Sequence, residues 1–326
     1  MIRMLLWAAT LIFVIAVYSG YRFFEPIRSE MLNMSDDYVE ISQGETFTSL
    51  CTKWQSQQVL KSCLPYKLYS KLYPNKFTLK AGVYNLQGLS VLSAIERLHS
   101  GDKADFTFTI IEGDTYNTVL KNLKNSAFLV FDMTDGDASN FKQYDNHHPE
   151  GWLYPDTYHY EGGTRASALI KRSHKKMKRV LADTWAKRSD NLPLKNEYEA
   201  LILASIIEKE SGEEAERDII SSVFHNRLNK GMRLQTDPTV IYGLGERFKG
   251  DITRSHLKEY TPYNTYRIER FPPTPIAMPS HDALLAAVQP AKTDYFYFVS
   301  KGNGAHHFSK SLKEHNRAVR KYILNR

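Results

Sequence analysis

The chain has 326 residues, of which 42% are hydrophobic and 24% charged, with 17 Gly and 13 Pro. These values exclude a collagen, a low-complexity polymer and a wholly disordered chain. The net charge of +7 favours an anionic partner, but no nucleic-acid-binding motif accompanies it. Two cysteines, Cys51 and Cys63, exclude a disulfide-rich scaffold and a four-thiolate zinc site, and leave open whether they form one bridge.

The first segment is long and apolar enough to cross a membrane. Residues 4–21 carry no charge, and at about 1.5 Å per residue they give a helix of about 27 Å, close to the hydrocarbon thickness of a bilayer. Residues 17–19 loosely fit a signal-peptide cleavage site, but the apolar run is longer than the usual signal core. We therefore favour an uncleaved anchor and predict a cytoplasmic stub and transmembrane helix over 1–22, with most of the chain outside the cytoplasm.

A polar tether over 23–37 and a small α/β region over 38–102 are predicted next. In this region residues 38–42 alternate as a strand, followed by Gly44-Glu45-Thr46 and a helical pattern. The same order recurs at 106–111, where a strand pattern leads through Gly113-Asp114-Thr115 into another helix. This similarity predicts a weak internal repeat, in which glycine permits the turn and the acid and threonine satisfy free amides at the helix start.

The remaining residues, 103–326, predict a mixed α+β domain. A basic run over 171–179 has helical spacing and is interpreted as a solvated helix face. Predicted helices cover 166–187, 197–211, 214–229, 237–243 and 282–288, and a strand covers 295–299.

Two acids near the end of the helix predicted over 197–211 differ in their expected surroundings. With about 100° per residue, Glu210 falls about 20° from Leu203, in the middle of the apolar stripe, whereas Glu208 falls about 140° away and is expected to face water. A carboxyl group on an apolar face near a helix end has a raised pKa and keeps a proton for donation. Helical geometry alone leaves a capping or salt-bridging role for Glu210 open.

The histidines do not predict a metal site. The chain has no His-Glu-x-x-His motif, and adjacent pairs such as His306-His307 and His147-His148 point to opposite faces of an extended strand. We expect structural or hydrogen-bonding roles for them. Phosphate-binding loops, dinucleotide fingerprints and the Gly-x-Ser-x-Gly motif are also absent from the sequence.

Several motifs together closely resemble the MltG (YceG-like) family of endolytic murein transglycosylases, over nearly the whole chain. They are 150–158 (EGWLYPDTY), 233–243 (RLQTDPTVIYG), 263–266 (YNTY), 271–276 (FPPTPI), 304–309 (GAHHFS) and 314–316 (EHN). The resemblance implies an α+β fold with a membrane anchor, a LysM-like region over 38–102 and a catalytic domain with a lysozyme-like helical site over 103–326. Residues 38–102 depart from a standard LysM pattern, so their grip on glycan stays open.

The function that the resemblance implies is an inner-membrane enzyme with a periplasmic catalytic domain. It would cut nascent peptidoglycan strands between N-acetylmuramic acid and N-acetylglucosamine, leave a 1,6-anhydro end, and so terminate strand elongation. The expected partners are glycan strands, the membrane and the penicillin-binding synthases. No cofactor, metal or nucleic acid is expected.

The catalytic glutamate of the family falls on Glu210. The Glu-Ser pair Glu210-Ser211 and the pair Tyr263-Asn264 are also similar to motifs of the broader lysozyme-like transglycosylases. Glu210 is expected to protonate the leaving oxygen and then to accept the proton of the C6 hydroxyl of the muramic acid as that hydroxyl attacks. Substrate contacts are expected from Ser211, Gln235, Tyr263, Asn264, Trp152 and Tyr154.

Three alternatives stay open from the sequence. Asp237 is expected to cap a helix before Pro238, but if it faced Glu210 across a cleft the enzyme would be a hydrolytic muramidase with two carboxylates. The second alternative is that the chain is a non-enzymatic peptidoglycan-binding scaffold, in which Glu210 has no chemical task. An anionic-polymer binder driven by the +7 charge would show affinity that falls steeply with salt.

Overall fold

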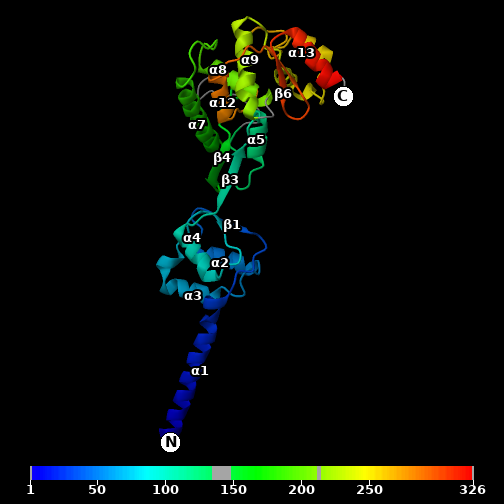
Figure 1. Ribbon diagram of the computed structural model, residues 1–326. Helices are drawn as coiled ribbons and strands as arrows, with labels where there is room; N and C mark the ends of the chain where they lie inside the picture. Colours follow the sequence, from blue (N-terminus) through cyan, green and yellow to red (C-terminus); the bar gives the residue numbers. More distant parts are fainter. Residues whose placement is uncertain (1, 134–147, 211–213, 325–326) are drawn as a thin grey trace. The chain divides into compact units, whose positions relative to one another are not determined.

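The computed structural model describes residues 2–133, 148–210 and 214–324. The chain divides into two compact units (Figure 1). The first comprises residues 1–107, 127–130 and 159–164, and the second comprises residues 108–126, 131–158 and 165–326. The chain therefore passes between the two units five times rather than at one boundary.

The first unit pairs two strands over a helical core. Strands β1 and β2 are antiparallel, with Val39 opposite Tyr84. The largest fully buried side chains of this unit include Trp54, Tyr66 and Tyr84. Its elements are α1 (Ile2–Ser29), β1 (Tyr38–Ile41), α2 (Phe47–Ser56), α3 (Leu64–Leu72), η1 (Pro74–Phe77), β2 (Gly82–Asn85) and α4 (Val91–Ser100).

Helix α1 continues beyond the apolar segment into the predicted tether. Ile27 and Leu32 are buried in the core of the first unit, and the Tyr66 hydroxyl donates a hydrogen bond of 2.7 Å to the Glu30 carboxylate. The expectation of a polar tether is wrong for these residues, because apolar side chains in the stretch find a core to bury in. Among the residues that the structure describes, α1 is the one helix whose length and composition suit a membrane span, over Ala9–Ser29.

The internal repeat predicted from the sequence is present in the local geometry. Gly44 and Gly113 have φ angles of 80° and 79°, in the left-handed region that glycine tolerates. Thr46 and Thr115 each cap the following helix by accepting a bond from the amide three residues on. The acids act differently from the expectation: Glu45 and Asp114 accept from the amide three residues before them, so they close the turn instead of capping the helix.

The second unit holds most of the helices and confirms the mixed α+β class. Strands β3 and β4 pair with each other, as do β5 and β6, the latter in antiparallel register. Strands β3 and β4 each have residues in both units. The elements are β3 (Asp105–Ile110), α5 (Tyr116–Lys124), β4 (Asp156–Glu161), α7 (Ala166–Ala186), α8 (Glu197–Glu210), η2 (Glu214–Glu216), α9 (Arg217–Asn229), α10 (Asp237–Leu244), η3 (Gly245–Arg247), α11 (Arg254–Lys258), α12 (His281–Val288), β5 (Tyr297–Ser300), β6 (His306–Ser309), α13 (Leu312–Val319) and η4 (Arg320–Leu324).

Helix α8 is the central element of the second unit. It packs against α7, α9, α10 and α12; α7, α9 and α12 are labelled near it in Figure 1. Every residue over 200–207 is buried, so the helix has no water-facing side along this stretch. A helix that is apolar all round is typical of a protein core. Its neighbour α7 does have two sides: Lys171, Lys175 and Arg179 are exposed, which confirms the solvated basic face.

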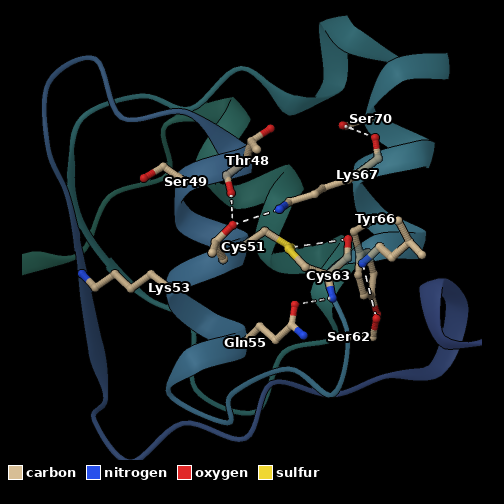
Figure 2. Close-up of a disulfide and its surroundings, with 12 residues drawn as sticks. Thr48, Ser49, Cys51, Lys53, Gln55, Ser62, Cys63, Tyr66, Lys67 and Ser70 are labelled. Carbon is tan, nitrogen blue, oxygen red and sulfur yellow. Dashed lines mark hydrogen bonds between the residues drawn. A yellow bond between two sulfur atoms is a disulfide. The ribbon is translucent and has the colours of Figure 1, made fainter.

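The two cysteines form a disulfide between α2 and the start of α3 (Figure 2). The Cα atoms of Cys51 and Cys63 are 5.8 Å apart, and both residues are buried in the core of the first unit. The bridge closes a short loop whose ends are packed together. Its redox state, which the sequence left open, is oxidised in this structure.

We expect reduction of this disulfide to destabilise the first unit. Closing a loop of this size contributes about 3 kcal/mol through the entropy of the unfolded chain. Thermal unfolding of the protein should therefore show a lower melting temperature with a reductant than without it. A Cys51→Ser/Cys63→Ser variant should melt at the lower temperature, and its melting temperature should be the same with and without the reductant. Equal melting of the oxidised and reduced wild type would contradict the prediction.

Candidate active site

A hollow of about 280 Å³ lies in the second unit at the carboxyl end of α8. It brings together segments that are far apart in the sequence, from α8, α9, the start of α10, the 263–266 loop, β5 and α13. Its lining mixes charged, polar and aromatic side chains: Glu210, Arg227, Leu234, Gln235, Asp237, Tyr266, Tyr297, Phe298, Leu312 and His315.

Glu210 is the last residue of α8 and reaches the hollow partly buried. Burial raises the pKa of its carboxyl group to about 7, and the negative charge of Asp237 acts in the same direction. A hydrogen bond from the Thr236 hydroxyl and the positive charge of Arg227 oppose this rise in pKa. At neutral pH the group therefore exists in comparable amounts as a proton donor and as a proton acceptor.

Thr236 is held in place by a small buried network of hydroxyl groups. Its amide donates a hydrogen bond of 3.0 Å to the hydroxyl of Thr265, which in turn lies 2.9 Å from the hydroxyl of Thr239. All three threonines are buried. The network fixes the hydroxyl that orients the Glu210 carboxyl group.

Asp237 does not cap α10, which corrects the sequence prediction. Thr236 occupies the cap position and makes no side-chain cap bond, while Asp237 is the first residue of the helix. The Asp237 carboxylate instead accepts a hydrogen bond of 2.7 Å from the Tyr266 hydroxyl. Both side chains line the hollow, so a second carboxylate shares the site with Glu210.

Gln235 lies in the hollow, as the sequence led us to expect. Its backbone adopts φ 51°, a left-handed conformation that costs free energy in a residue with a side chain. The side-chain oxygen accepts a bond of 3.4 Å from Arg227, which leaves the amide nitrogen to donate elsewhere. Gln235 therefore lines the hollow with an amide nitrogen that its bond to Arg227 does not use.

Arg227 is a charged residue of the site that the sequence analysis missed. It is buried on α9, where its guanidinium group donates to the carbonyls of Leu234 and Phe296, both at 2.7 Å. The same group lies 5.1 Å from the centre of the Tyr297 ring. The one available signal was an arginine between the apolar residues Phe224 and Leu228, both of which are buried on the same helix.

The aromatic residues expected to contact substrate lie elsewhere in the second unit. Trp152 is buried and stacks on Tyr198 with ring centres 6.1 Å apart, and the ring of Tyr154 faces Lys176. Tyr263 shares a hydrogen bond of 2.9 Å with Thr274. These three residues are not among the described residues that line the hollow, whose aromatic surface comes from Tyr266, Tyr297 and Phe298.

Asn264 is fully buried and serves the loop that carries Tyr266. Its side-chain nitrogen donates to the carbonyl of Glu259 at 2.6 Å, and its oxygen accepts from the amide of Tyr266 at 3.0 Å. These bonds, with others to His256 and Leu257, occupy both ends of the side chain, which does not line the hollow. Ser211, expected beside Glu210, lies outside the described residues.

Glu208 is not exposed to water, contrary to the expectation from the helical wheel. Only 7% of its side chain is exposed, and its carboxylate accepts bonds from the amide and hydroxyl of Ser280. Arg217 lies 3.5 Å away. The wheel failed because α8 is enclosed on all sides, so a side chain opposite the apolar stripe meets α12 rather than solvent.

A further buried acid, Glu150, lies outside the hollow. It accepts hydrogen bonds from the Tyr242 hydroxyl and the Tyr116 amide, both at 2.9 Å, and burial raises its pKa to about 7. Among the described residues, no group of three or more His, Cys, Asp or Glu side chains is arranged to hold a metal ion. His306 instead pairs with Glu216 at 2.8 Å; His147 lies outside the described residues.

These features define an α+β protein whose site is built around one partly buried carboxyl group in a small hollow of polar and aromatic side chains. The model of the YceG-like family matches residues 39–321. The chain belongs to the YceG-like family.

Named relatives and a solved structure agree with this membership. The endolytic murein transglycosylase of Bacillus subtilis strain 168 is 31% identical, over 94% of this chain and 90% of its own length. The endolytic murein transglycosylase of Streptococcus pneumoniae strain D39 is 27% identical, over 87% of this chain and 58% of its own length. A crystal structure of a YceG-like protein from Listeria monocytogenes has 31% identity and a TM-score of 0.55, covering 86% of this chain and 98% of that one.

We expect Glu210→Gln to stabilise the protein at high pH. The folded-state pKa of about 7 lies above the ordinary value of 4.5, so the native state binds more protons than the unfolded chain between these values. Below pH 4.5 the carboxyl group is protonated in both the folded and the unfolded chain, so its burial does not change stability through ionisation. As the pH rises from 4.5 to 7 the unfolded chain loses this proton while the folded chain keeps it, which progressively destabilises the fold.

Denaturant unfolding at pH 5 and pH 8 measures this effect. The variant should exceed the wild type by about 1–3 kcal/mol at pH 8 and by much less at pH 5. The exposed Glu246→Gln serves as the control and should show no such pH dependence. A Glu210→Gln gain that is equal at both pH values would show that ionisation is not its cause.

Proposed function

We propose that this chain is a membrane-anchored lytic transglycosylase that cleaves peptidoglycan strands. The observation that carries the proposal is Glu210, whose carboxyl group has a pKa of about 7 and borders a hollow lined by polar, charged and aromatic side chains. A general acid works best when its pKa lies near the working pH. The names of the Bacillus and Streptococcus relatives support the same substrate class and reaction.

In the proposed reaction one carboxyl group performs both proton transfers. Glu210 gives its proton to the oxygen that leaves the anomeric carbon of the muramic acid, cleaving its β-1,4 bond to N-acetylglucosamine. The C6 hydroxyl of the same sugar then attacks that carbon, and the ionised Glu210 takes its proton, which yields a 1,6-anhydro end. The attacking group is already tethered, which can replace about 7–11 kcal/mol of positioning cost.

The other polar residues of the hollow suit this reaction. Asp237 supplies a negative charge that stabilises the positive charge developing at the anomeric carbon. Gln235 offers an amide donor, and Tyr266 and Tyr297 offer flat rings for a sugar face. Because the hollow is at the small end of the range for ligand pockets, we infer that it holds about one sugar unit.

We further propose that α1 anchors the enzyme in the bacterial inner membrane, with the catalytic unit in the periplasm. The length of α1 and its uncharged run over residues 4–21 support the anchor, and the buried disulfide suits an oxidising compartment. Action beside the membrane fits a role in terminating nascent strands next to the penicillin-binding synthases. The first unit, which we compare to LysM, would then hold the glycan or space the catalytic unit from the membrane.

A hydrolytic muramidase is the second candidate, favoured by one specific observation. Asp237 lines the hollow with Glu210 instead of capping α10, as two-carboxylate hydrolysis requires. The products separate the two reactions. Mass spectrometry of digested peptidoglycan should show fragments one water lighter than reducing fragments if the lytic route operates. Exclusively reducing fragments would overturn the lytic route and support hydrolysis.

We predict that Glu210→Gln abolishes cleavage while the fold persists. Loss of a positioned general acid lowers the rate by about 10²–10⁴-fold. The measurement is release of soluble muropeptides from purified peptidoglycan, with circular dichroism to confirm folding. If the wild type itself releases nothing while binding the strands, the scaffold alternative holds.

Glu208→Gln is the matched control for this experiment. It makes the same change two residues earlier on α8, at an acid bonded to Ser280 and outside the hollow. We expect it to lower the melting temperature through the weakened contact with α12, yet to keep the cleavage rate per folded molecule within about threefold, as befits a change remote from the chemistry. Equal loss of activity in both variants would assign the effect to α8 as a whole.

The pH profile of cleavage should report the ionisation of Glu210. The free enzyme must carry the proton to act, so kcat/KM should decline above a pKa of about 7, approaching a tenfold loss per pH unit. Rates measured on one soluble oligosaccharide between pH 5 and pH 9 test this. A profile that stays flat up to pH 9 would remove Glu210 as the donor.

A further inference from the structure

His315, on α13, lines the hollow but has no task in the reaction proposed above. Its Nδ1 atom is buried and has no hydrogen-bond partner within the described parts of the chain. The other ring nitrogen, Nε2, is not among the buried atoms without a partner, and the ring borders the hollow. Because Nδ1 is enclosed and the ring borders the hollow, we assign any contact with a bound molecule to Nε2.

The surroundings of the ring decide which nitrogen carries the proton. A proton on Nδ1 would be a buried donor without an acceptor, which is unfavourable, so the proton belongs on Nε2. Burial and the positive charges of Arg227 and His307 lower the pKa of His315. At neutral pH the ring is thus neutral and presents an Nε2–H donor to the hollow.

The donor is also held in a fixed direction. The imidazole of His315 stacks on the ring of Tyr297, with centres 5.2 Å apart and planes at 26°. Arg227 packs on the same tyrosine and is itself bonded to backbone carbonyls. A donor that is ordered before binding gains affinity because little rotational freedom is lost.

We propose that His315 is a substrate-contacting residue that recognises the N-acetyl group of the sugar in the hollow, its Nε2–H donating to the acetyl carbonyl. Both sugars of a peptidoglycan strand carry this group, and an amide carbonyl is a strong acceptor in a chain of hydroxyl-bearing rings. The inference rests on the proposed function, because it names what the same hollow binds. It assigns α13 to the substrate site.

Binding of two neutral oligosaccharides tests the inference. Chitotetraose carries an N-acetyl group on each sugar, whereas cellotetraose carries a hydroxyl in its place. Glu210→Gln, which should bind without turnover, is the background for all measurements on the full chain. We expect this protein to prefer chitotetraose, and the addition of His315→Phe to weaken chitotetraose binding about tenfold and leave cellotetraose unchanged.

The choice of variants separates recognition from folding. Phenylalanine keeps a flat ring against Tyr297 and removes only the nitrogens, whereas His315→Gln keeps a donor and should restore part of the preference. Asn316→Ala, at the exposed next position of α13, should leave both affinities unchanged. Equal weakening of both sugars by His315→Phe, or no change in either, would overturn the inference.

A spectroscopic readout tests the contact directly. In the Glu210→Gln protein, the Nε2 resonance of His315 should shift when chitotetraose is added and not when cellotetraose is added, while His99 in the first unit stays unmoved. A His315 resonance that ignores chitotetraose at saturation would also overturn the inference. Failure of the proposed function is distinguishable, because it appears as wild-type protein that binds these sugars but cuts no peptidoglycan.

Discussion

The site depends on keeping one carboxyl group where water solvates it poorly. Glu210 ends a helix whose preceding turns are buried on every side, so its position is set by the core of the second unit and not by the surface. An ionised carboxylate is unfavourable in such a place, and the pKa rises accordingly. Burying this carboxyl group lowers the stability of the fold, and the packing of α8 against four other helices offsets the loss.

The two acids at the end of α8 show how environment assigns different roles to the same residue type. Glu208 is nearly enclosed, yet two bonds from Ser280 and a nearby Arg217 satisfy its charge. Within the described residues, Glu210 accepts a hydrogen bond from Thr236 and has a negative neighbour in Asp237. The contacts of Glu208 join α8 to α12, whereas the surroundings of Glu210 leave its carboxyl group able to donate and accept a proton.

The sequence predicted the elements of this fold well where the pattern was local. Turns such as Gly44-Glu45-Thr46, the helices after them and the basic face of α7 depend on neighbours in the chain, and each was found. Errors arose where long-range packing decides. The tether before residue 38 was inferred from polarity and the water-facing Glu208 from its place on the helical wheel. Ile27, Leu32 and Glu208 are instead covered by parts of the chain distant in sequence.

The same distinction holds within the site. Glu210 and Gln235 were identified from motifs and do line the hollow. Arg227, Tyr297 and His315 come from α9, β5 and α13, and their meeting cannot be read from spacing along the chain. Trp152 and Asn264 sit in equally distinctive motifs but are buried, because a motif also records what the fold needs for packing.

The two copies of the repeated turn, at Gly44 and Gly113, lie in different surroundings. Around Gly44 no atom lies within 4 Å of the place where a side chain would begin, so that copy faces open space. In the other copy the carbonyl of Gly113 accepts a hydrogen bond from the ammonium group of Lys209, the residue before Glu210. The Gly113 amide donates to the carbonyl of Met278, and the Met278 amide donates to the carbonyl of Asp114. The second copy is thus tied to the end of the helix that carries Glu210, so a change of shape in this turn would be transmitted to the acid, whereas the first copy has no such connection within the described part of the chain.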